Sequence, residues 1–260
     1  MTSLEYISQC YRNYRSSRID DNISPNDAMF NEWYFSVGES AIDNIALAAL
    51  ASRLSCVERV LDLPCGHGRV LRHITKFFPE ATIYACDLDV DGVRFCEKTF
   101  GAMPIPSLPK LENVVFPCAF DVIWVGSLFT HMRRETIKRS LLYLSRYLSP
   151  CGIIVATIHG RWVEHAYEIC RYIGEDRWKK IMDEYRSGGY GYCDYIKEES
   201  HAYIEHSYGV SIIRPHIILS DIEEMPGVRV LMYRERGWAD HQDVVVVGKP
   251  AYNEKWPGMK

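Results

Sequence analysis

The segment that most constrains the fold of this chain is Val60–Leu71, VLDLPCGHGRVL, in which an apolar strand ends in a carboxylate and leads through a glycine turn into a helix. Strand-like and helix-like patterns continue in alternation after it. The strands are expected at 59–63, 82–87, 120–126 and 152–158, and the helices at 68–78, 90–99 and 134–148. This alternation predicts an α/β fold with a parallel sheet covered by helices on both faces.

The segments that flank this core carry weaker signals. Residues 1–57 contain a breaker cluster at 20–26 and apolar positions at helical spacing over 40–54, which predicts a helical addition packed on the domain. The proline-rich stretch 102–118 is expected to hold a minimal third strand and an irregular loop.

The last third of the chain combines a helical pattern with strongly β-prone runs. Residues 162–186 are predicted to be helical, and the Gly/Tyr-rich segment 187–195 is predicted to be a loop. The runs 228–235 and 243–248 are separated by a short linker, so we expect an antiparallel hairpin at the sheet edge.

Two carboxylates, Asp62 and Asp87, close consecutive predicted strands. Between them, Gly66 and Gly68 remove Cβ atoms where the backbone must pass close to a ligand. Asp87 lies nineteen residues after Gly68, a spacing at which an acid reaches ribose hydroxyls in nucleotide-binding α/β folds. A Gly-x-Gly alone is equally typical of an ordinary tight turn, but the combination predicts a nucleoside-containing cofactor.

Val60–Gly68 resembles the first motif of class I S-adenosylmethionine (SAM) dependent methyltransferases, Asp/Glu-x-Gly-x-Gly-x-Gly, with Pro64 in place of the first glycine. Asp87 is similar to the ribose-binding acid of that family, and FDVIWVGSLFTH, residues 120–131, to its fourth-strand motif beside the methyl group. LSPCGI, residues 148–153, resembles the turn that enters its fifth strand.

This resemblance implies a seven-stranded, mostly parallel Rossmann-like sheet with an antiparallel edge hairpin. SAM would be the cofactor and S-adenosylhomocysteine (SAH) the product. The division expected is a helical addition or lid at 1–57 and a methyltransferase domain at 58–250, with an elaborated substrate region at about 160–240. The residues expected to bind the cofactor are Asp62, Pro64, Cys65, Gly66, Gly68, Arg69, Asp87, Leu88, Gly126, Ser127 and Leu128.

A nicotinamide-binding Rossmann domain is the main alternative for the same pattern. Its fingerprint Gly-x-Gly-x-x-Gly requires glycine at position 71, where this chain has Leu71. Asp62 would repel an anionic pyrophosphate, whereas in the methyltransferase family such a residue supports the methionine end of SAM. A non-catalytic SAM-binding protein would share the cofactor residues and differ in showing no turnover.

Methyl transfer from a sulfonium is an in-line displacement, so the enzyme chiefly aligns the acceptor and can remove its proton. Three histidines near predicted strand ends can titrate near neutral pH: His131, His159 and His241. His131 is the first candidate for a general base and His159 the second. His131 can instead shape the pocket or cap a helix, and His159 can instead serve a turn. His67 is expected to point outward or to contact the cofactor.

Aromatic and charged side chains gather at 190–195 and 234–243, and loops at the open edge of such a sheet select substrates. These aromatics can instead anchor the core, and Tyr34 and Phe35 can either cover the cofactor or pack against the domain. The substrate residues expected are Tyr190, Tyr192, Tyr195, Arg236, Trp238 and His241.

The motifs LDLPCGHGR and ERGWADHQD resemble bacterial enzymes linked with surface glycans or secondary metabolism, which implies O-methylation of a sugar or other small molecule. Protein or RNA methylation is the alternative. The net charge of −4, without a long block of Lys and Arg, disfavours a nucleic-acid partner. The segment Gly126–Phe129 replaces the Asn/Asp-Pro-Pro-aromatic motif of adenine and cytosine amine methyltransferases.

Composition also bears on the cellular setting. No apolar run approaches the ~18 to 20 residues that span a bilayer, and the amino terminus lacks a signal-peptide pattern, so we expect a cytoplasmic protein. Nine scattered cysteines without a Cys-x-x-Cys pair predict reduced thiols. We expect no metal site, because no His, Asp and Glu cluster has metal-ligand spacing.

Overall fold

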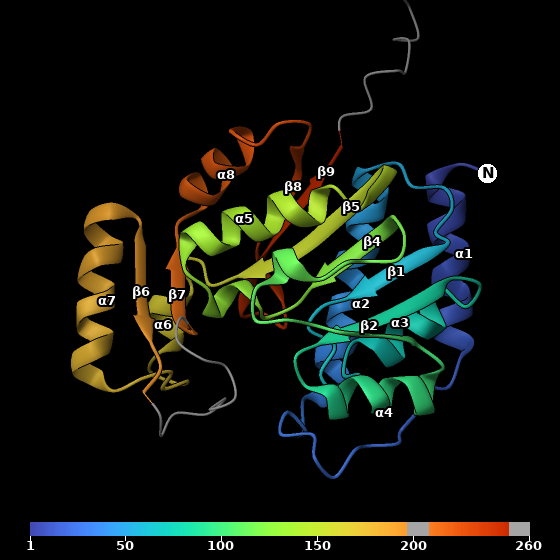
Figure 1. Cartoon of the computed structure of the whole chain (residues 1–260), viewed down its shortest axis with the longest axis horizontal. Helices are drawn as coiled ribbons and strands as arrows, with labels where there is room; N and C mark the ends of the chain where they lie inside the picture. The colour runs from blue at the N-terminus through green and yellow to red at the C-terminus, as the bar shows by residue number, and fades with distance from the viewer. Residues whose placement is uncertain (197–207, 250–260) are drawn as a thin grey trace, which may run out of the picture.

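The computed structural model describes residues 1–196 and 208–249 of the 260-residue chain. Its central sheet has seven strands in the order β3-β2-β1-β4-β5-β9-β8 (Figure 1). In this sheet β9 runs antiparallel to β5 and β8, whereas β1 to β5 pair in parallel, so the predicted fold class is confirmed. The strands are β1 (Arg59–Asp62), β2 (Thr82–Asp87), β3 (Met103–Pro106), β4 (Phe120–Val125), β5 (Leu148–Ile158), β8 (Arg229–Trp238) and β9 (Gln242–Gly248).

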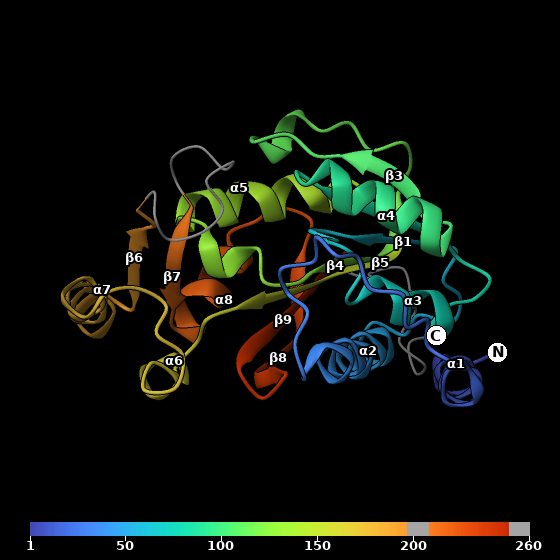
Figure 2. The ribbon, with the colours of Figure 1, turned by 90° about the horizontal axis from the view of Figure 1, so that it is seen from below.

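The central strands are buried at most positions because helices cover both faces of the sheet. Val60 and Val122 pack on the face of α1, α2 and α3, whereas Leu61 and Ile123 pack on the face of α5 and α8. Figure 2 shows α2 and α3 on the opposite side of the sheet from α5. The bounds of these helices are α1 (Ser3–Ser16), α2 (Tyr34–Ala51), α3 (Leu71–Phe77), α5 (Arg134–Ser145) and α8 (Pro215–Glu223).

The expected third strand lies within the proline-rich stretch, as β3. Strand β3 is at the edge of the sheet and pairs with β2, so two prolines are tolerated where one side needs no ladder donors. Helix α4 (Val90–Phe100) joins β2 to β3. The short 3-10 turn η1 (Leu111–Asn113) follows, and the expected hairpin at the other edge is confirmed as β8 and β9.

The loop prediction for 187–195 is wrong, because Tyr190–Asp194 form strand β6, which pairs antiparallel with β7 (Gly209–Ile213). The glycines that favoured a loop permit close packing instead. A Cβ atom on Gly209 would lie 1.9 Å from the carbonyl oxygen of Cys193, and one on Gly191 would lie 2.3 Å from that of Ile181. Glycine in a strand thus marks a close approach of two backbones here.

The predicted helix over 162–186 is divided into α6 (Val163–Ala166) and α7 (Glu175–Gly188). Together with β6 and β7 these helices form a cap beside the central sheet, at the left of Figure 1. Trp178 and Tyr185 of α7 share a hydrophobic cluster with Val210 of β7. None of the helices in the described ranges combines the length and apolar character needed to cross a membrane.

Candidate active site

A cavity of about 520 Å³ opens at the carboxyl ends of β1, β2 and β4. The strand order reverses between β1 and β4, and such a switch point is the usual ligand site of open parallel sheets. All of the expected cofactor residues except Gly68 line the cavity, namely Asp62, Pro64, Cys65, Gly66, Arg69, Asp87, Leu88, Gly126, Ser127 and Leu128. Gly68 lies in the turn below, where a Cβ atom would come 2.5 Å from the ring of Phe100.

Asp87 fixes the glycine turn and lies on the cavity wall. One of its carboxylate oxygens accepts a hydrogen bond from the Gly66 amide at 2.7 Å, and the other accepts one from the Asp89 amide at 2.9 Å. Gly66 has a φ of +49°, in the left-handed region that glycine adopts without strain. Burial raises the pKa of Asp87. Each carboxylate oxygen can accept a second hydrogen bond, so Asp87 retains the capacity to bind ligand hydroxyls.

Asp62 ends β1 at the floor of the cavity, and its side chain is 1% exposed. Neither of its oxygens has a hydrogen-bond partner among the described residues. Burial and the nearby Asp87 raise the pKa of Asp62 well above its ordinary value, and the charge of Arg69 opposes this shift. Because buried polar groups are normally hydrogen-bonded, the floor of the cavity fits a ligand that brings a positive charge or N–H donors.

The loop after β4 is held by polar contacts with two other strands. Ser127 has a φ of +57°, and its amide donates a hydrogen bond to Thr157 Oγ1 on β5 at 2.8 Å. Gln242 of β9 donates to Ser127 Oγ at 3.1 Å and accepts from Thr157 Oγ1 at 2.6 Å. Gln242 was not foreseen, because its partners lie far from it in the sequence.

His131 ends the 3-10 turn η2 (Phe129–His131) and lines the cavity. Its Nδ1 lies 2.9 Å from the carbonyl oxygen of Gly209 on β7. A carbonyl oxygen can only accept, so Nδ1 carries the hydrogen and Nε2 is the basic nitrogen of the neutral ring. The hydroxyl of Tyr195 lies 3.2 Å from the same Nδ1, and the ring of Tyr208 lies 4.7 Å from the imidazole ring.

The other two candidate histidines do not line this cavity. His159 is 3% exposed, and its Nδ1 has no partner among the described residues. Burial lowers the pKa of His159 well below its ordinary value, with smaller contributions from His131 and His241. His241 lies 2.7 Å from the Tyr172 hydroxyl through its Nε2, and burial also lowers the pKa of His241.

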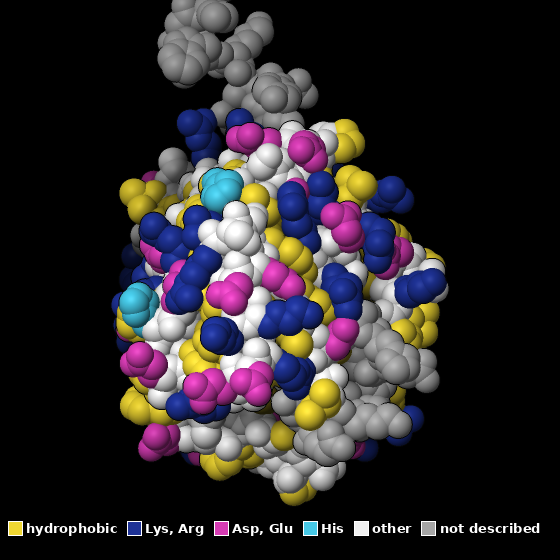
Figure 3. All heavy atoms as spheres, turned by 90° about the vertical axis from the view of Figure 1, so that its left-hand side faces the viewer, with side chains coloured by type: hydrophobic (Ala, Val, Ile, Leu, Met, Phe, Trp, Pro, Cys, Tyr) yellow, Lys and Arg dark blue, Asp and Glu magenta, His cyan; other side chains and the backbone are white. Residues whose placement is uncertain are grey.

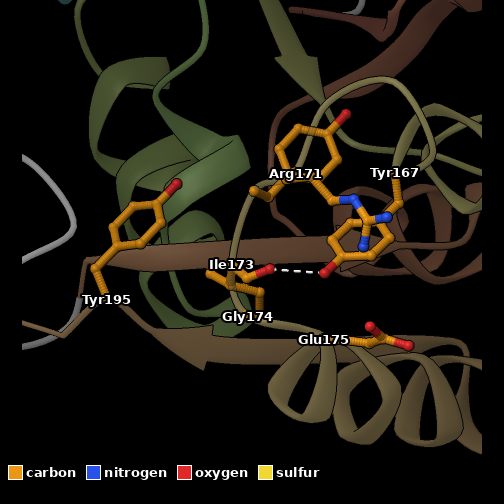
Figure 4. A pocket seen from close by; sticks show the side chains of 7 residues that line it. Tyr167, Arg171, Ile173, Gly174, Glu175 and Tyr195 are labelled. Atoms are coloured by element: carbon orange, nitrogen blue, oxygen red, sulfur yellow. Dashed lines mark hydrogen bonds between the residues drawn. The ribbon is translucent and has the colours of Figure 1, made fainter.

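Two of the expected substrate residues lie where a ligand can reach them. Trp238 lines the cavity, with its indole N–H donating to the Val37 carbonyl oxygen at 2.9 Å. Tyr195 lines an adjacent groove of about 610 Å³, in which it stands across Ile173 and Gly174 from Tyr167 and Arg171 (Figure 4). The residues lining this groove are Tyr167, Arg171, Tyr172, Ile173, Gly174, Glu175 and Tyr195.

The remaining expected substrate residues have protein partners and line neither cavity nor groove. The hydroxyl of Tyr190 accepts a hydrogen bond from the Arg134 amide at 2.9 Å. The guanidinium of Arg133 lies 4.4 Å from the ring of Tyr192, and Arg236 lies 3.6 Å from the ring of Trp162.

The sequence predicted a helical addition or lid at 1–57 but did not single out the segment that lines the cavity from the amino-terminal side. The segment between α1 and α2 contributes four residues to the lining of the cavity: Asn26, Asp27, Ala28 and Met29. Their only signal was the cluster of turn-forming residues before α2, which gives no partner and no direction.

Residues 61–154 match a family model described as a methyltransferase domain. A malonyl-[acyl-carrier protein] O-methyltransferase of Halalkalibacterium halodurans is 30% identical over 107 residues, a match that covers 39% of this chain and 39% of that protein. The chain therefore matches about two-fifths of the length of this curated relative.

Solved structures share the fold at low sequence identity. An S-adenosylmethionine-dependent methyltransferase from Clostridium acetobutylicum has a TM-score of 0.55 and 13% identity, with 86% of this chain and 94% of that chain covered. The protein DhpI, solved in a complex with SAM and HEP, has a TM-score of 0.55 and 12% identity, with 95% of each chain covered.

Proposed function

We propose that this chain, whose residues 61–154 match a family model described as a methyltransferase domain, is a class I SAM-dependent enzyme that methylates an oxygen of a small-molecule acceptor, with a sugar hydroxyl as the first choice. The observation that carries the cofactor part of the proposal is Asp62, a buried carboxylate without a described partner at the cavity floor. SAM brings an ammonium group and a sulfonium charge, which this carboxylate suits. A dinucleotide would bring an anionic pyrophosphate to the same place.

Each cofactor residue can be assigned to the part of SAM that its chemistry suits. We assign the ammonium group of SAM to Asp62 and the ribose hydroxyls to Asp87, whose oxygens still have accepting capacity. The loop Gly126–Leu128 and Leu88 would border the rest of the cofactor. When bound, SAM supplies a methyl group that is already activated for displacement.

His131 is the residue that we assign to the acceptor proton. Its hydrogen bond to Gly209 places the proton on Nδ1, so the basic Nε2 can accept a proton from the acceptor hydroxyl as the oxygen–methyl bond forms. Tyr195, which contacts His131 and also lines the adjacent groove, connects this base to a surface that an acceptor can occupy.

The small-molecule part of the proposal is supported by the groove and by the matched relative, which is named an O-methyltransferase. The groove presents tyrosine rings, which offer flat apolar faces, together with the positively charged Arg171 and the negatively charged Glu175, which can form hydrogen bonds. Such a surface suits a polyhydroxylated ring better than a polyanion. Figure 3 shows that basic and acidic side chains are interspersed on the face of the molecule at the cap.

The test is transfer from methyl-labelled SAM to separate pools of mono- and disaccharides, phenols, bacterial protein and RNA. We expect label in the sugar or phenol pool together with one SAH per methyl group, and loss of this label in His131→Ala. Label confined to the protein or RNA pool would contradict the acceptor class. Failure of the protein to bind SAM would contradict the cofactor assignment.

A further inference from the structure

Arg72 is a fully buried arginine on α3 that belongs to no part of the proposed chemistry. Its guanidinium makes five hydrogen bonds, which is its full donor capacity. All five acceptors are neutral, and the rings of Tyr34, Phe35 and Phe100 lie within 5.0 to 5.6 Å of the guanidinium carbon. Burying a charge in this way is costly, so the contacts that satisfy it are strongly specified.

The five contacts join two segments that are otherwise distant in the sequence. Nε donates to the Gly68 carbonyl oxygen at 3.0 Å and Nη2 to that of His67 at 3.4 Å, both in the glycine turn. Nη1 donates to the carbonyl oxygens of Asp20 and Asn22, each at 2.9 Å. Arg72 therefore ties the start of the segment between α1 and α2 to the turn below the cofactor cavity.

Tyr34 completes the connection at the other end of that segment. Its side chain is fully buried, and its hydroxyl accepts from Arg72 Nη2 at 3.1 Å while donating to Asp27 Oδ2 at 2.6 Å. Asp27 and its neighbours Asn26 and Met29 line the cavity. Asn26 also donates to Asp91 Oδ2 at 2.9 Å, the same oxygen that lies 3.0 Å from His67 Nε2.

We propose that residues 20–34 form a strap over the cofactor cavity, and that Arg72 and Tyr34 are positioning residues that clip it to the glycine turn. The strap is held at both ends by one guanidinium, so releasing the clip loosens residues 26–29 at the cavity wall, where Asn26 keeps its hydrogen bond to Asp91. Since the same guanidinium contacts the glycine turn, strap and turn are coupled, and opening the clip is the step by which SAM enters and SAH leaves. This inference rests on the proposed cofactor, but the clip can be measured without it.

The test variant is Tyr34→Phe, which removes one hydroxyl and with it the links to Arg72 and Asp27. The matched control is Tyr14→Phe. The buried Tyr14 hydroxyl also contacts α3, since it lies 2.7 Å from His73 Nδ1, but Tyr14 belongs to α1 and not to the strap. Arg72→Lys is a second variant, which keeps the charge with three donors in place of five.

Two measurements separate the clip from the cofactor assignment. In the ligand-free protein, hydrogen exchange of the amides at 20–33 should be at least about tenfold faster in Tyr34→Phe than in the wild type or Tyr14→Phe, as expected for loss of a buried hydrogen bond to a charged group. In stopped-flow fluorescence, SAH should dissociate about tenfold faster from Tyr34→Phe and at the wild-type rate from Tyr14→Phe.

Equal exchange at 20–33 in the wild type, Tyr34→Phe and Tyr14→Phe would overturn the clip, whatever the cofactor is. Faster exchange with an unchanged SAH dissociation rate would overturn the coupling of the strap to the ligand. A wild-type protein that fails to bind SAH would contradict the proposed function, and the exchange experiment alone would then decide the clip.

Discussion

The cofactor side and the acceptor side of the cavity are built by different means. On the cofactor side, Asp62, the glycine turn and Asp87 lie within one strand-turn-helix-strand unit, and each carboxylate closes a strand. On the acceptor side, His131 is held by Gly209, a residue 78 positions away on a strand outside the central sheet. The first arrangement follows from local pattern, whereas the second depends on how the cap packs beside the sheet.

The largest expected effect separates chemistry from cofactor binding. His131→Ala removes the proposed base, so kcat should fall by about 10²- to 10⁴-fold. The SAH dissociation constant from calorimetry should stay within about twofold, because His131 is assigned to the acceptor proton and not to the cofactor. A parallel loss of SAH affinity would show that His131 contributes to cofactor binding.

The next effect tests the cofactor side alone. Asp87→Ala removes the assigned ribose ligand and the acceptor for the Gly66 amide, so SAM binding measured by calorimetry should weaken by about 1 to 3 kcal/mol. Asp43→Ala, at an exposed carboxylate bound to Tyr11, is the control and should bind SAM normally. Unchanged affinity in a folded Asp87→Ala protein would refute the ribose assignment.

The pH dependence of SAM binding tests Asp62. Because its pKa is raised, the free protein holds this carboxyl protonated above the ordinary aspartate range, whereas the cation of SAM favours the charged form. The affinity for SAM should therefore rise with pH from the ordinary aspartate range up to the raised pKa of Asp62 in the free protein, by up to about tenfold per pH unit. Above that pKa the carboxyl is ionised in the free protein and the affinity should stop rising.

Asp62→Asn is the matched variant for this titration, because Asp87 also has a raised pKa and remains in place. The slope of affinity against pH should become shallower in Asp62→Asn. An identical slope in both proteins would assign the proton to another group.

The smallest effect tests the acceptor side. Tyr195→Phe removes a hydroxyl that contacts His131, on a residue that lines the groove, so kcat/KM for the acceptor should fall about threefold to tenfold with SAH affinity unchanged. Tyr192→Phe lies on β6 outside the cavity and the groove and should leave kcat/KM unchanged. Equal kinetics in both variants would remove the groove from the acceptor path.

The cofactor side could be predicted from sequence because parallel strands bring their carboxyl ends to one edge. Asp62, Gly66 and Asp87 each stand at a strand end or in the turn after it, so their meeting follows from the alternation of strands and helices alone. The same alternation predicted the order of elements through β5, whereas the β8–β9 hairpin was predicted from two β-prone runs joined by a short linker.

The acceptor side and the strap could not be predicted in this way. Gly191 and Gly209 carry the same local signal whether they form a loop or allow two strands to approach closely, and the packing of the cap decides between them. The strap depends on Arg72, whose partners Asp20 and Tyr34 lie 52 and 38 positions away. In the sequence, Arg72 is one of several polar residues of LRHITKF, and only the structure shows that it is buried and which acceptors it contacts.

Calorimetric titration of the purified protein with SAM, SAH and NAD in parallel distinguishes a cavity that binds SAM from one that binds a dinucleotide. We expect SAM and SAH to bind with one site per chain and NAD not to bind, because the floor of the cavity is a buried carboxylate suited to a cation. Binding of NAD without binding of SAM or SAH would contradict this expectation.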